Sequence, residues 1–158
     1  MPNNNFTKSI GCIVMRGNDV LLVKHTYGSA NGRYLTPGGC CNENEAPEAT
    51  AHRELWEETK IKAEIKELVG IRFFPDSWYV VFKMDYVEGT PTSDGFENSE
   101  AIFMDINEAI THPLITNLSK VLLESMLLDN SNGLKRYANY TSPQVPEATL
   151  YGVNYTKE

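Results

Sequence analysis

The sequence is poor in cysteine and has no long apolar run. Only three of its 158 residues are cysteine, Cys12, Cys40 and Cys41, and no apolar stretch reaches the roughly 20 residues that cross a bilayer. The odd cysteine count and the lack of a secretion signal favour reduced thiols in a cytoplasmic protein. No second Cys/His pair stands at zinc spacing, so we expect the cysteines to be small buried side chains rather than zinc ligands.

Basic residues are also in the minority. The chain has 14 Lys and Arg against 21 Asp and Glu, a net charge of −7. This balance argues against nucleic acid or anionic membrane as a general partner, because both attract an excess of Lys and Arg. It does not exclude a phosphate ligand, because a bound cation can reverse the local charge.

The length and the 41% hydrophobic content suit one globular domain. Strand patterns surround one central helix, and a second helix comes late, which predicts an α+β domain with a mixed sheet. Asn44 is the expected N-cap of the central helix. The expected strands are 9–15, 20–24, 33–36, 63–73, 78–87 and 101–106, and the expected helices are 45–59 and 117–128.

The C-terminal stretch differs from the rest. Residues 134–158 contain two prolines and four tyrosines, Tyr137, Tyr140, Tyr151 and Tyr155, which is too aromatic for a typical disordered tail. We therefore expect residues 1–133 to form the domain. The tail should pack on that domain or on a second subunit, which would make the protein a homodimer.

Three glutamates of the central helix are expected on one face. At about 100° per residue, Glu57 and Glu58 flank Glu54 on either side. Such like charges repel each other, and a hard cation such as Mg²⁺ would remove that cost. A solvated acidic surface would explain the three glutamates alone, but Gly38 and Gly39 just upstream allow the backbone to approach a ligand closely.

A longer pattern contains these residues. Gly39, five residues, Glu45, seven residues and then Arg53-Glu54-Leu55-Trp56-Glu57-Glu58-Thr59-Lys60-Ile61 resembles the box of the Nudix hydrolase family. Lys60 is the only departure, since the family has Gly there. This position after the helix often adopts a left-handed conformation, so Lys60 should cost strain or change the loop. Asn44, where many members have Gly, tolerates that conformation.

The resemblance implies a role for each matching residue. Glu54, Glu57 and Glu58 match metal-binding carboxylates, and Gly39 matches a carbonyl ligand. Arg53 and Glu45 match a supporting pair. A further glutamate before the last sheet strand completes many family sites, either as a ligand or as the base, and we prefer Glu97 to Glu100. The catalytic candidates are therefore Glu54, Glu57, Arg53 and Glu97.

The resemblance also implies a sheet sandwiched between helices and a function. The expected reaction is hydrolysis, dependent on Mg²⁺ or Mn²⁺, of a phosphoanhydride in a small-molecule nucleotide: a nucleoside triphosphate, a nucleotide sugar such as ADP-ribose, or a dinucleoside polyphosphate. Gly38, Gly39 and Tyr79 are the substrate-binding candidates. Tyr79 and Trp78 are expected to pack in the core, with base contacts as the minority hypothesis for the aromatic residues Tyr27, Tyr34, Phe73, Phe74, Trp78 and Tyr79. The alternatives are a catalytically silent nucleotide-binding or regulatory module and an acidic interaction domain that uses the tail.

Overall fold

A mixed β-sheet runs through the protein. The computed structural model describes residues 5–128 and 133–153. The strands are β1 (Thr7–Arg16), β2 (Asp19–His25), β3 (Tyr34–Leu35), β4 (Gly38–Cys40), β5 (Lys62–Phe74), β6 (Ser77–Glu88), β7 (Asn98–Asp105), β8 (Leu134–Arg136) and β9 (Tyr151–Gly152). The helices are α1 (Pro47–Thr59), α2 (Ile106–Thr111) and α3 (Asn117–Met126), with a short 3₁₀ turn, η1 (Gly28–Ala30).

Strand β1 lies at the centre of the sheet. It forms the predicted hairpin with β2, and it also pairs in parallel with β6, where Ile10 lies opposite Val80. Residues 10–14 of β1 are all buried. The strand order is β3-β2-β1-β6-β5-β8-β9, while β4 pairs with β1 and β7 pairs with β2.

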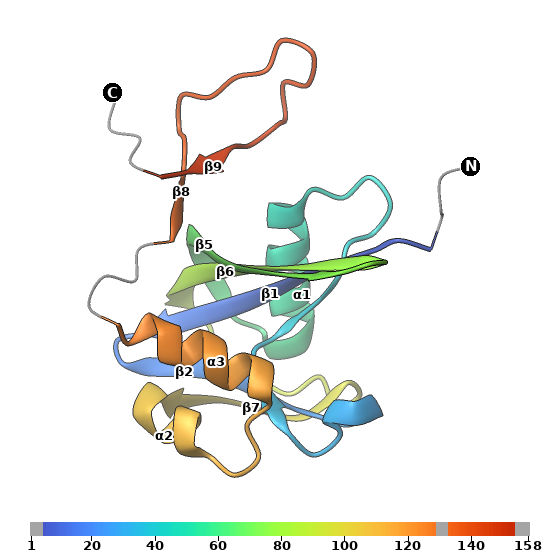
Figure 1. Cartoon of the computed structure of the whole chain (residues 1–158). Coiled ribbons are helices and arrows are strands. Elements are labelled where there is room, and N and C mark those ends of the chain that lie inside the picture. Colours follow the sequence, from blue (N-terminus) through green and yellow to red (C-terminus); the bar gives the residue numbers. More distant parts are fainter. Residues whose placement is uncertain (1–4, 129–132, 154–158) are drawn as a thin grey trace.

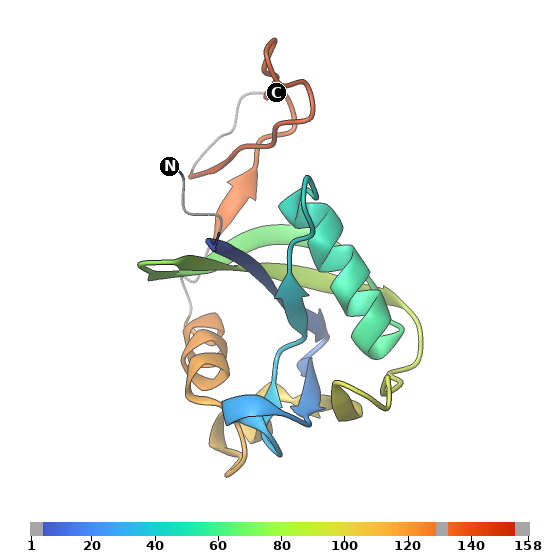
Figure 2. The ribbon, with the colours of Figure 1, turned by 90° about the vertical axis from the view of Figure 1, so that its right-hand side faces the viewer.

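Helices cover both faces of this sheet (Figures 1 and 2). Helix α1 packs on one face, where Leu55 joins a core with Ile10 and Phe82. On the other face, Leu123 of α3 packs in a core with Val81 and with Ala109 of α2. The predicted α+β sandwich is therefore confirmed. No helix in the described ranges is long and apolar enough to cross a membrane.

The ends of α1 differ in part from the prediction. The N-cap is Ala46 rather than Asn44, and Pro47 occupies the first turn. Asn44 instead has a left-handed backbone, with φ of 63°, in the loop that leads into the helix. Lys60, just after the helix, has φ of 60°, which is the left-handed conformation that the family's Gly adopts freely.

Two sequence-based expectations about burial are wrong. Cys40 is exposed, because it ends β4 at the surface, whereas Cys12 in the central strand is fully buried. Trp78 is 48% exposed. It lies near the β5–β6 turn, beyond the part of the sheet that α1 covers, and contacts the edges of the Phe6 and Phe73 rings.

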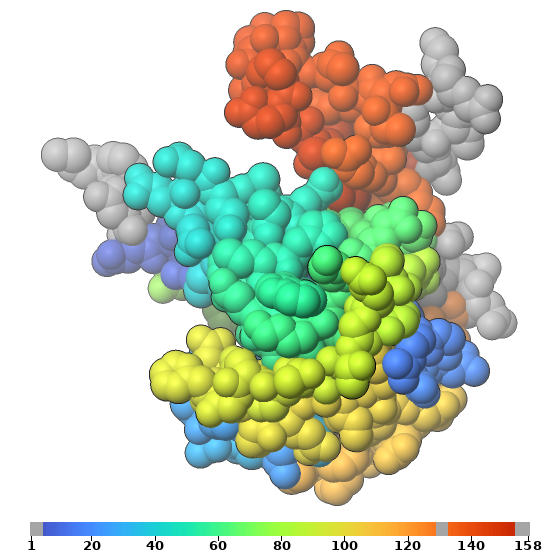
Figure 3. Space-filling model, turned by 180° about the vertical axis from the view of Figure 1, so that it is seen from behind, coloured from blue at the N-terminus to red at the C-terminus, as the bar shows by residue number. Residues whose placement is uncertain are grey.

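The described part of the tail begins as a continuation of the sheet. Strand β8 pairs with β5, and β9 pairs with β8. Tyr151 packs on Phe82, with ring centres 5.6 Å apart, and its hydroxyl donates to Glu48 of α1. The segment between β8 and β9 stands out above the body of the protein (Figures 1 and 3). Residues 154–158, which include Tyr155, lie outside the described residues.

Candidate metal and catalytic site

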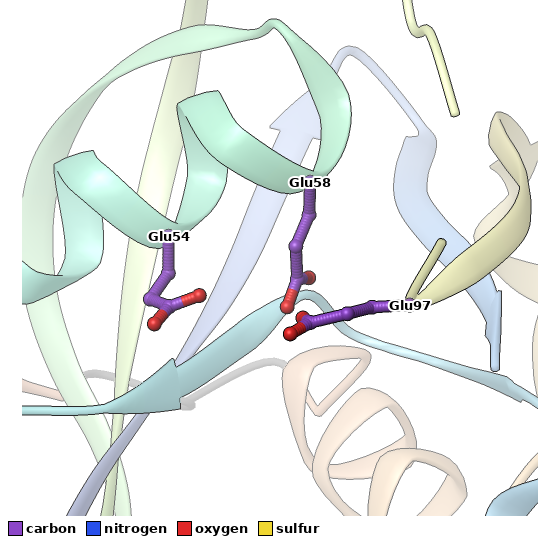
Figure 4. Close-up of side chains that lie close together, drawn as sticks. All are labelled: Glu54, Glu58 and Glu97. Carbon is purple, nitrogen blue, oxygen red and sulfur yellow. The ribbon is translucent and has the colours of Figure 1, made fainter. Parts of the chain in front are cut away.

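Three carboxylates from two segments meet beside α1. Glu54 and Glu58 lie on α1, and Glu97 immediately precedes β7; one oxygen of each lies within 4.8 Å of the others. Figure 4 shows Glu54 and Glu58 pointing from the helix toward the carboxylate of Glu97. Such a group of oxygen atoms is the donor set that hard divalent cations prefer.

The electrostatics of this cluster favour a positive ligand. Burial and, to a smaller extent, the nearby charges of Glu54 and Glu97 raise the pKa of Glu58 to about 8, although the Gly38 N–H that donates to its carboxylate acts in the opposite direction. Burial also raises the pKa of Glu54. A cation at the cluster would offset both the burial and the mutual repulsion of the carboxylates.

Two glycines allow the β4 backbone to approach the cluster. A Cβ atom at Gly39 would lie 2.4 Å from Cδ of Glu54, and one at Gly38 would lie 2.1 Å from the carbonyl oxygen of Ile10. A side chain at Gly38 would collide with the β1 backbone, and one at Gly39 would displace the Glu54 carboxylate. The backbone N–H of Gly38 donates to Oε2 of Glu58 at 3.2 Å, so β4 contacts one cluster residue by its backbone.

Arg53 ties the helix to the preceding loop. Its guanidinium donates to both oxygens of Glu45, at 2.8 and 2.9 Å, and to the carbonyl of Cys40 at 3.0 Å. It also donates to Glu54 at 2.9 Å. The hydrogen bonds from Arg53, with a smaller one from Thr50, lower the pKa of Glu45 to about 2. Arg53 therefore orients Glu54 and anchors β4 to the helix.

Glu57 lies apart from the cluster. Its side chain is 55% exposed and accepts a hydrogen bond from Arg53 at 3.1 Å. The helical spacing puts Glu57 and Glu58 on opposite sides of Glu54. Glu58 turns inward toward Gly38, while Glu57 pairs with Arg53 one turn earlier. The structure thus brings together Glu54, Glu58 and Glu97. Glu57 lies outside this cluster, at its exposed rim.

Glu97 reaches the cluster, whereas Glu100 does not belong to it. The carboxylate of Asp94 accepts hydrogen bonds from the backbone N–H groups of residues 96, 97 and 98, which fixes the turn that carries Glu97. Glu100 instead accepts a bond from the Tyr34 hydroxyl at 2.6 Å. The sequence analysis missed Asp94, although the Asp94-Gly95 pair is a turn signal that could have revealed it.

Asn98 is a second residue that the sequence analysis missed. Its side-chain Nδ2 donates to the backbone carbonyl of Glu58 at 3.0 Å. This bond joins the end of α1 to the start of β7, and so connects the segments that carry Glu58 and Glu97. No sequence pattern points to it, because the contact depends on how the sheet brings β7 beside the helix.

Tyr79 packs with the core on the α3 face of the sheet. Its ring covers Gly11, where a Cβ atom would lie 2.0 Å from the Tyr79 hydroxyl oxygen. Burial raises its pKa to about 12, and the hydroxyl shares a hydrogen bond with Thr36. Tyr79 is therefore linked to the loop before Gly38, but it is on the opposite side of the sheet from α1.

Comparisons with known proteins identify the family of the chain. The model of the NUDIX domain family matches residues 5–125. The chain is 31% identical over 101 residues to an ADP-ribose pyrophosphatase of Methanocaldococcus jannaschii, covering 60% of this chain and 59% of that protein. It is 32% identical over 127 residues to the NAD-capped RNA hydrolase NudC of Mannheimia succiniciproducens, covering 75% of this chain and 47% of that protein. The chain therefore spans less than two thirds of the length of these relatives.

Solved structures show the same fold. A NUDIX hydrolase from Nitrosomonas europaea superposes with a TM-score of 0.71 at 25% identity, over 78% of this chain and 71% of that one. A MutT NUDIX hydrolase from Burkholderia pseudomallei superposes with a TM-score of 0.67 at 20% identity, over 75% and 95% of the two chains. With the family model matching most of its length, the chain belongs to the NUDIX domain family.

Proposed function

We propose that the protein hydrolyses a phosphoanhydride bond in a nucleoside diphosphate linked to another group, with Mg²⁺ or Mn²⁺ as cofactor. The observation that supports this most is the cluster of Glu54, Glu58 and Glu97. Its donor atoms are all oxygens, and burial, which disfavours the charged form, raises the pKa of Glu58. These residues fit a hard divalent cation.

The proposed ligands come from the cluster and its rim. Glu54, Glu58 and Glu97 would hold the cation, with the backbone carbonyl of Gly39 beside Glu54 and with Glu57 from the rim. When bound, such a cation polarises phosphoryl oxygens and lowers the pKa of a bound water. Like Glu54, Glu57 accepts a hydrogen bond from Arg53 through one of its two carboxylate oxygens.

The side chains of the site have separate roles in the proposed reaction. One carboxylate, from Glu54, Glu57 or Glu97, accepts the proton of the attacking water. The water oxygen forms a new bond to phosphorus, and the bond from that phosphorus to the bridging oxygen breaks. Arg53 keeps Glu54 in place, and the glycine backbone of Gly38 and Gly39 lets the diphosphate approach. The products are a nucleoside monophosphate and a phosphorylated remainder.

The relatives favour a substrate with a group on each side of the diphosphate. One relative is named for ADP-ribose and another for NAD-capped RNA, and both names describe a diphosphate between two larger groups. We propose a small-molecule substrate of this class, either a nucleotide sugar or a dinucleotide. Tyr79 stays a candidate contact through its link to Thr36, which lies next to the glycine loop.

A hydrolysis screen tests the proposal. The whole chain would be incubated with a panel of ADP-ribose, NAD, dinucleoside polyphosphates and nucleoside triphosphates, with Mg²⁺, Mn²⁺ or EDTA. We expect product from at least one compound, loss of activity in EDTA, and recovery with Mg²⁺ or Mn²⁺. Activity that survives exhaustive chelation would exclude the metal-dependent mechanism, and no product from any compound would favour a silent binding module.

Substitutions in the cluster make the test specific. Glu58→Gln and Glu97→Gln keep the side-chain shape but remove a charge, so turnover should fall by at least roughly a hundredfold. Without metal, neither variant should lose stability, because each relieves repulsion among carboxylates. Glu124→Gln is the control, since Glu124 is exposed on α3 and pairs only weakly with Lys120 at 3.9 Å. Glu48 of α1 is unsuitable as the control, because Arg136 and Tyr151 bind its carboxylate.

A further inference from the structure

A small cavity adjoins the carboxylate cluster. Its volume is about 30 Å³, and the residues that line it include Glu58 and Glu97 together with His25, Thr36 and Asn98. A cavity needs about 10–15 Å³ and two to four polar partners to hold one water molecule. This cavity is large enough for one water, and its walls supply the polar groups.

Two buried polar atoms in its walls have no hydrogen-bond partner among the described residues. They are Nδ1 of His25 and Oδ1 of Asn98. Asn98 is only 2% exposed, so bulk water cannot satisfy its carbonyl oxygen. An unsatisfied buried polar group destabilises the folded chain, and two such groups on residues that line one small cavity indicate a shared polar ligand.

The register of the sheet places these two residues together. Lys24 of β2 lies opposite Glu100 of β7, but the next residue, His25, lies opposite Asn98, so Ser99 is an extra residue in β7. Such a bulge changes the direction of neighbouring side chains. Directly opposed residues of an antiparallel pair have Cβ atoms about 4.5–5.5 Å apart, which is close enough for both side chains to bind one water.

We propose that His25 and Asn98 are positioning residues that hold one water molecule against the Glu58 and Glu97 carboxylates. The water has two O–H groups and two lone pairs, so it can bind Asn98 Oδ1, His25 Nδ1 and a carboxylate at the same time. Asn98 also binds the Glu58 carbonyl through Nδ2. Through this water the pair orients one carboxylate of the cluster, a role that rests on the proposed function of the cluster as a cation site.

Two substitutions of His25 show whether the residue acts through a polar contact of Nδ1 or only through packing of its side chain. In His25→Asn, the side-chain amide stands about where the imidazole Nδ1 stood, so the variant keeps a polar atom facing the cavity. In His25→Gln, the amide stands about where Nε2 stood, so the cavity loses its polar atom. Asn98→Leu has nearly the same shape as the native residue and removes both the hydrogen bond to the Glu58 carbonyl and the proposed bond to the water.

The first measurement is a high-resolution crystal structure of each full-length protein. We expect an ordered water in the cavity of the wild type and of His25→Asn, and no such water in His25→Gln. The second is a titration with Mn²⁺ alone, followed by electron paramagnetic resonance without substrate. Loss of a residue that orients metal ligands typically weakens metal binding about 10- to 100-fold. We expect this loss in His25→Gln and Asn98→Leu, and an affinity close to wild type in His25→Asn.

The outcomes distinguish this inference from the proposed function. If the wild type binds Mn²⁺ and His25→Gln binds it equally well, the positioning role is wrong while the cation site stands. If the wild type holds the water but binds no Mn²⁺, the proposed function fails and the water site alone is retained. A wild-type cavity without an ordered water overturns the inference whatever the titration shows. If Asn98→Leu does not fold, the two His25 variants still decide the question.

Discussion

Lys60 stands where the family box has Gly, and the structure shows what this costs. The residue keeps the left-handed conformation that ends α1, and its backbone N–H donates to the Trp56 carbonyl at 3.0 Å. Its ammonium lies 5.3 Å from the centre of the Trp56 ring. A left-handed conformation costs a non-glycine residue roughly 1–2 kcal/mol, so the helix end is strained but otherwise ordinary.

Lys60→Gly should therefore stabilise the protein, by about 1 kcal/mol after the loss of the weak cation–π contact. Metal dependence should stay intact, and catalytic efficiency should change less than about tenfold. Urea unfolding would measure the stability, and steady-state kinetics would measure the metal dependence and the catalytic efficiency. The matched control is Lys60→Ala, which removes the same ammonium but keeps the strain and should not gain stability. A larger kinetic effect of Lys60→Gly would show that Lys60 contacts the substrate.

Glu57 gives a second test at the scale of one residue. If Glu57 joins the cation, Glu57→Gln should lower turnover by at least roughly a hundredfold, because a charge near the reacting phosphate is removed. Its Mn²⁺ affinity should fall in parallel. An unchanged turnover would mean that Glu57 serves only as a surface partner of Arg53.

Some of these residue positions were predictable and others were not. The spacing of Glu54, Glu57 and Glu58 predicts a shared helix face, because it depends only on the helical repeat. It does not predict that Glu58 becomes buried against Gly38 while Glu57 pairs with Arg53. That outcome depends on side-chain rotamers and on the position of β4, which are properties of the folded chain.

At the scale of elements, the sequence predicts the long strands and helices well. Their apolar periodicity is strong, and the turn at residues 16–19 matches the hairpin. Three kinds of element were missed: the short strand β4, the six-residue helix α2, and the tail strands β8 and β9. Each is too short to show a period, and each forms because a neighbouring element supplies its partners.

The tail strands connect to the first turn of α1 through Glu48. Arg136 of β8 donates to this carboxylate at 3.1 Å, and the Tyr151 hydroxyl donates at 2.9 Å. Burial, together with the bond to Glu48, raises the pKa of Tyr151. The same glutamate thus links the two tail strands to the helix that carries the box.

Glu48→Ala should loosen this link. We expect faster amide exchange in β8, β9 and the first turn of α1, and a loss of about 1 kcal/mol in unfolding free energy, as for a partly exposed charged contact. Hydrogen–deuterium exchange with mass spectrometry would locate the effect. The control is Glu64→Ala, because the Glu64 side chain is exposed and, among the described residues, forms an ion pair with Lys66 alone. Equal exchange in the two variants would show that the tail does not depend on Glu48 for its position.

At the scale of the whole molecule, Glu58 makes the stability depend on pH. Its pKa is about 8 in the folded chain, against an ordinary value of 4.5 for a glutamate side chain. Between these values, the folded state binds a proton that the unfolded state releases, so the free energy of unfolding falls as pH rises. In EDTA, the melting temperature of the wild type should therefore fall between about pH 5 and pH 8 relative to that of Glu58→Gln.

A divalent cation should reverse this trend. It binds the deprotonated carboxylates of the folded chain, so adding Mg²⁺ or Mn²⁺ at about pH 8 should raise the melting temperature of the wild type. Glu58→Gln should respond much less. Thermal scans would give the melting temperatures of the wild type and of Glu58→Gln, each with and without metal. Parallel pH curves for the two proteins in EDTA would contradict the raised pKa.

The central position of β1 has a consequence for how the chain is made. This strand is synthesised before its parallel partner β6, which begins about 70 positions later, at Ser77 opposite Thr7. Pairing over such a separation is slow, because the intervening loop must be closed first. The box helix leaves the ribosome before β6, and Glu97 and Asn98 follow still later. A nascent chain that stops after α1 would carry most of the motif but could not assemble the carboxylate cluster.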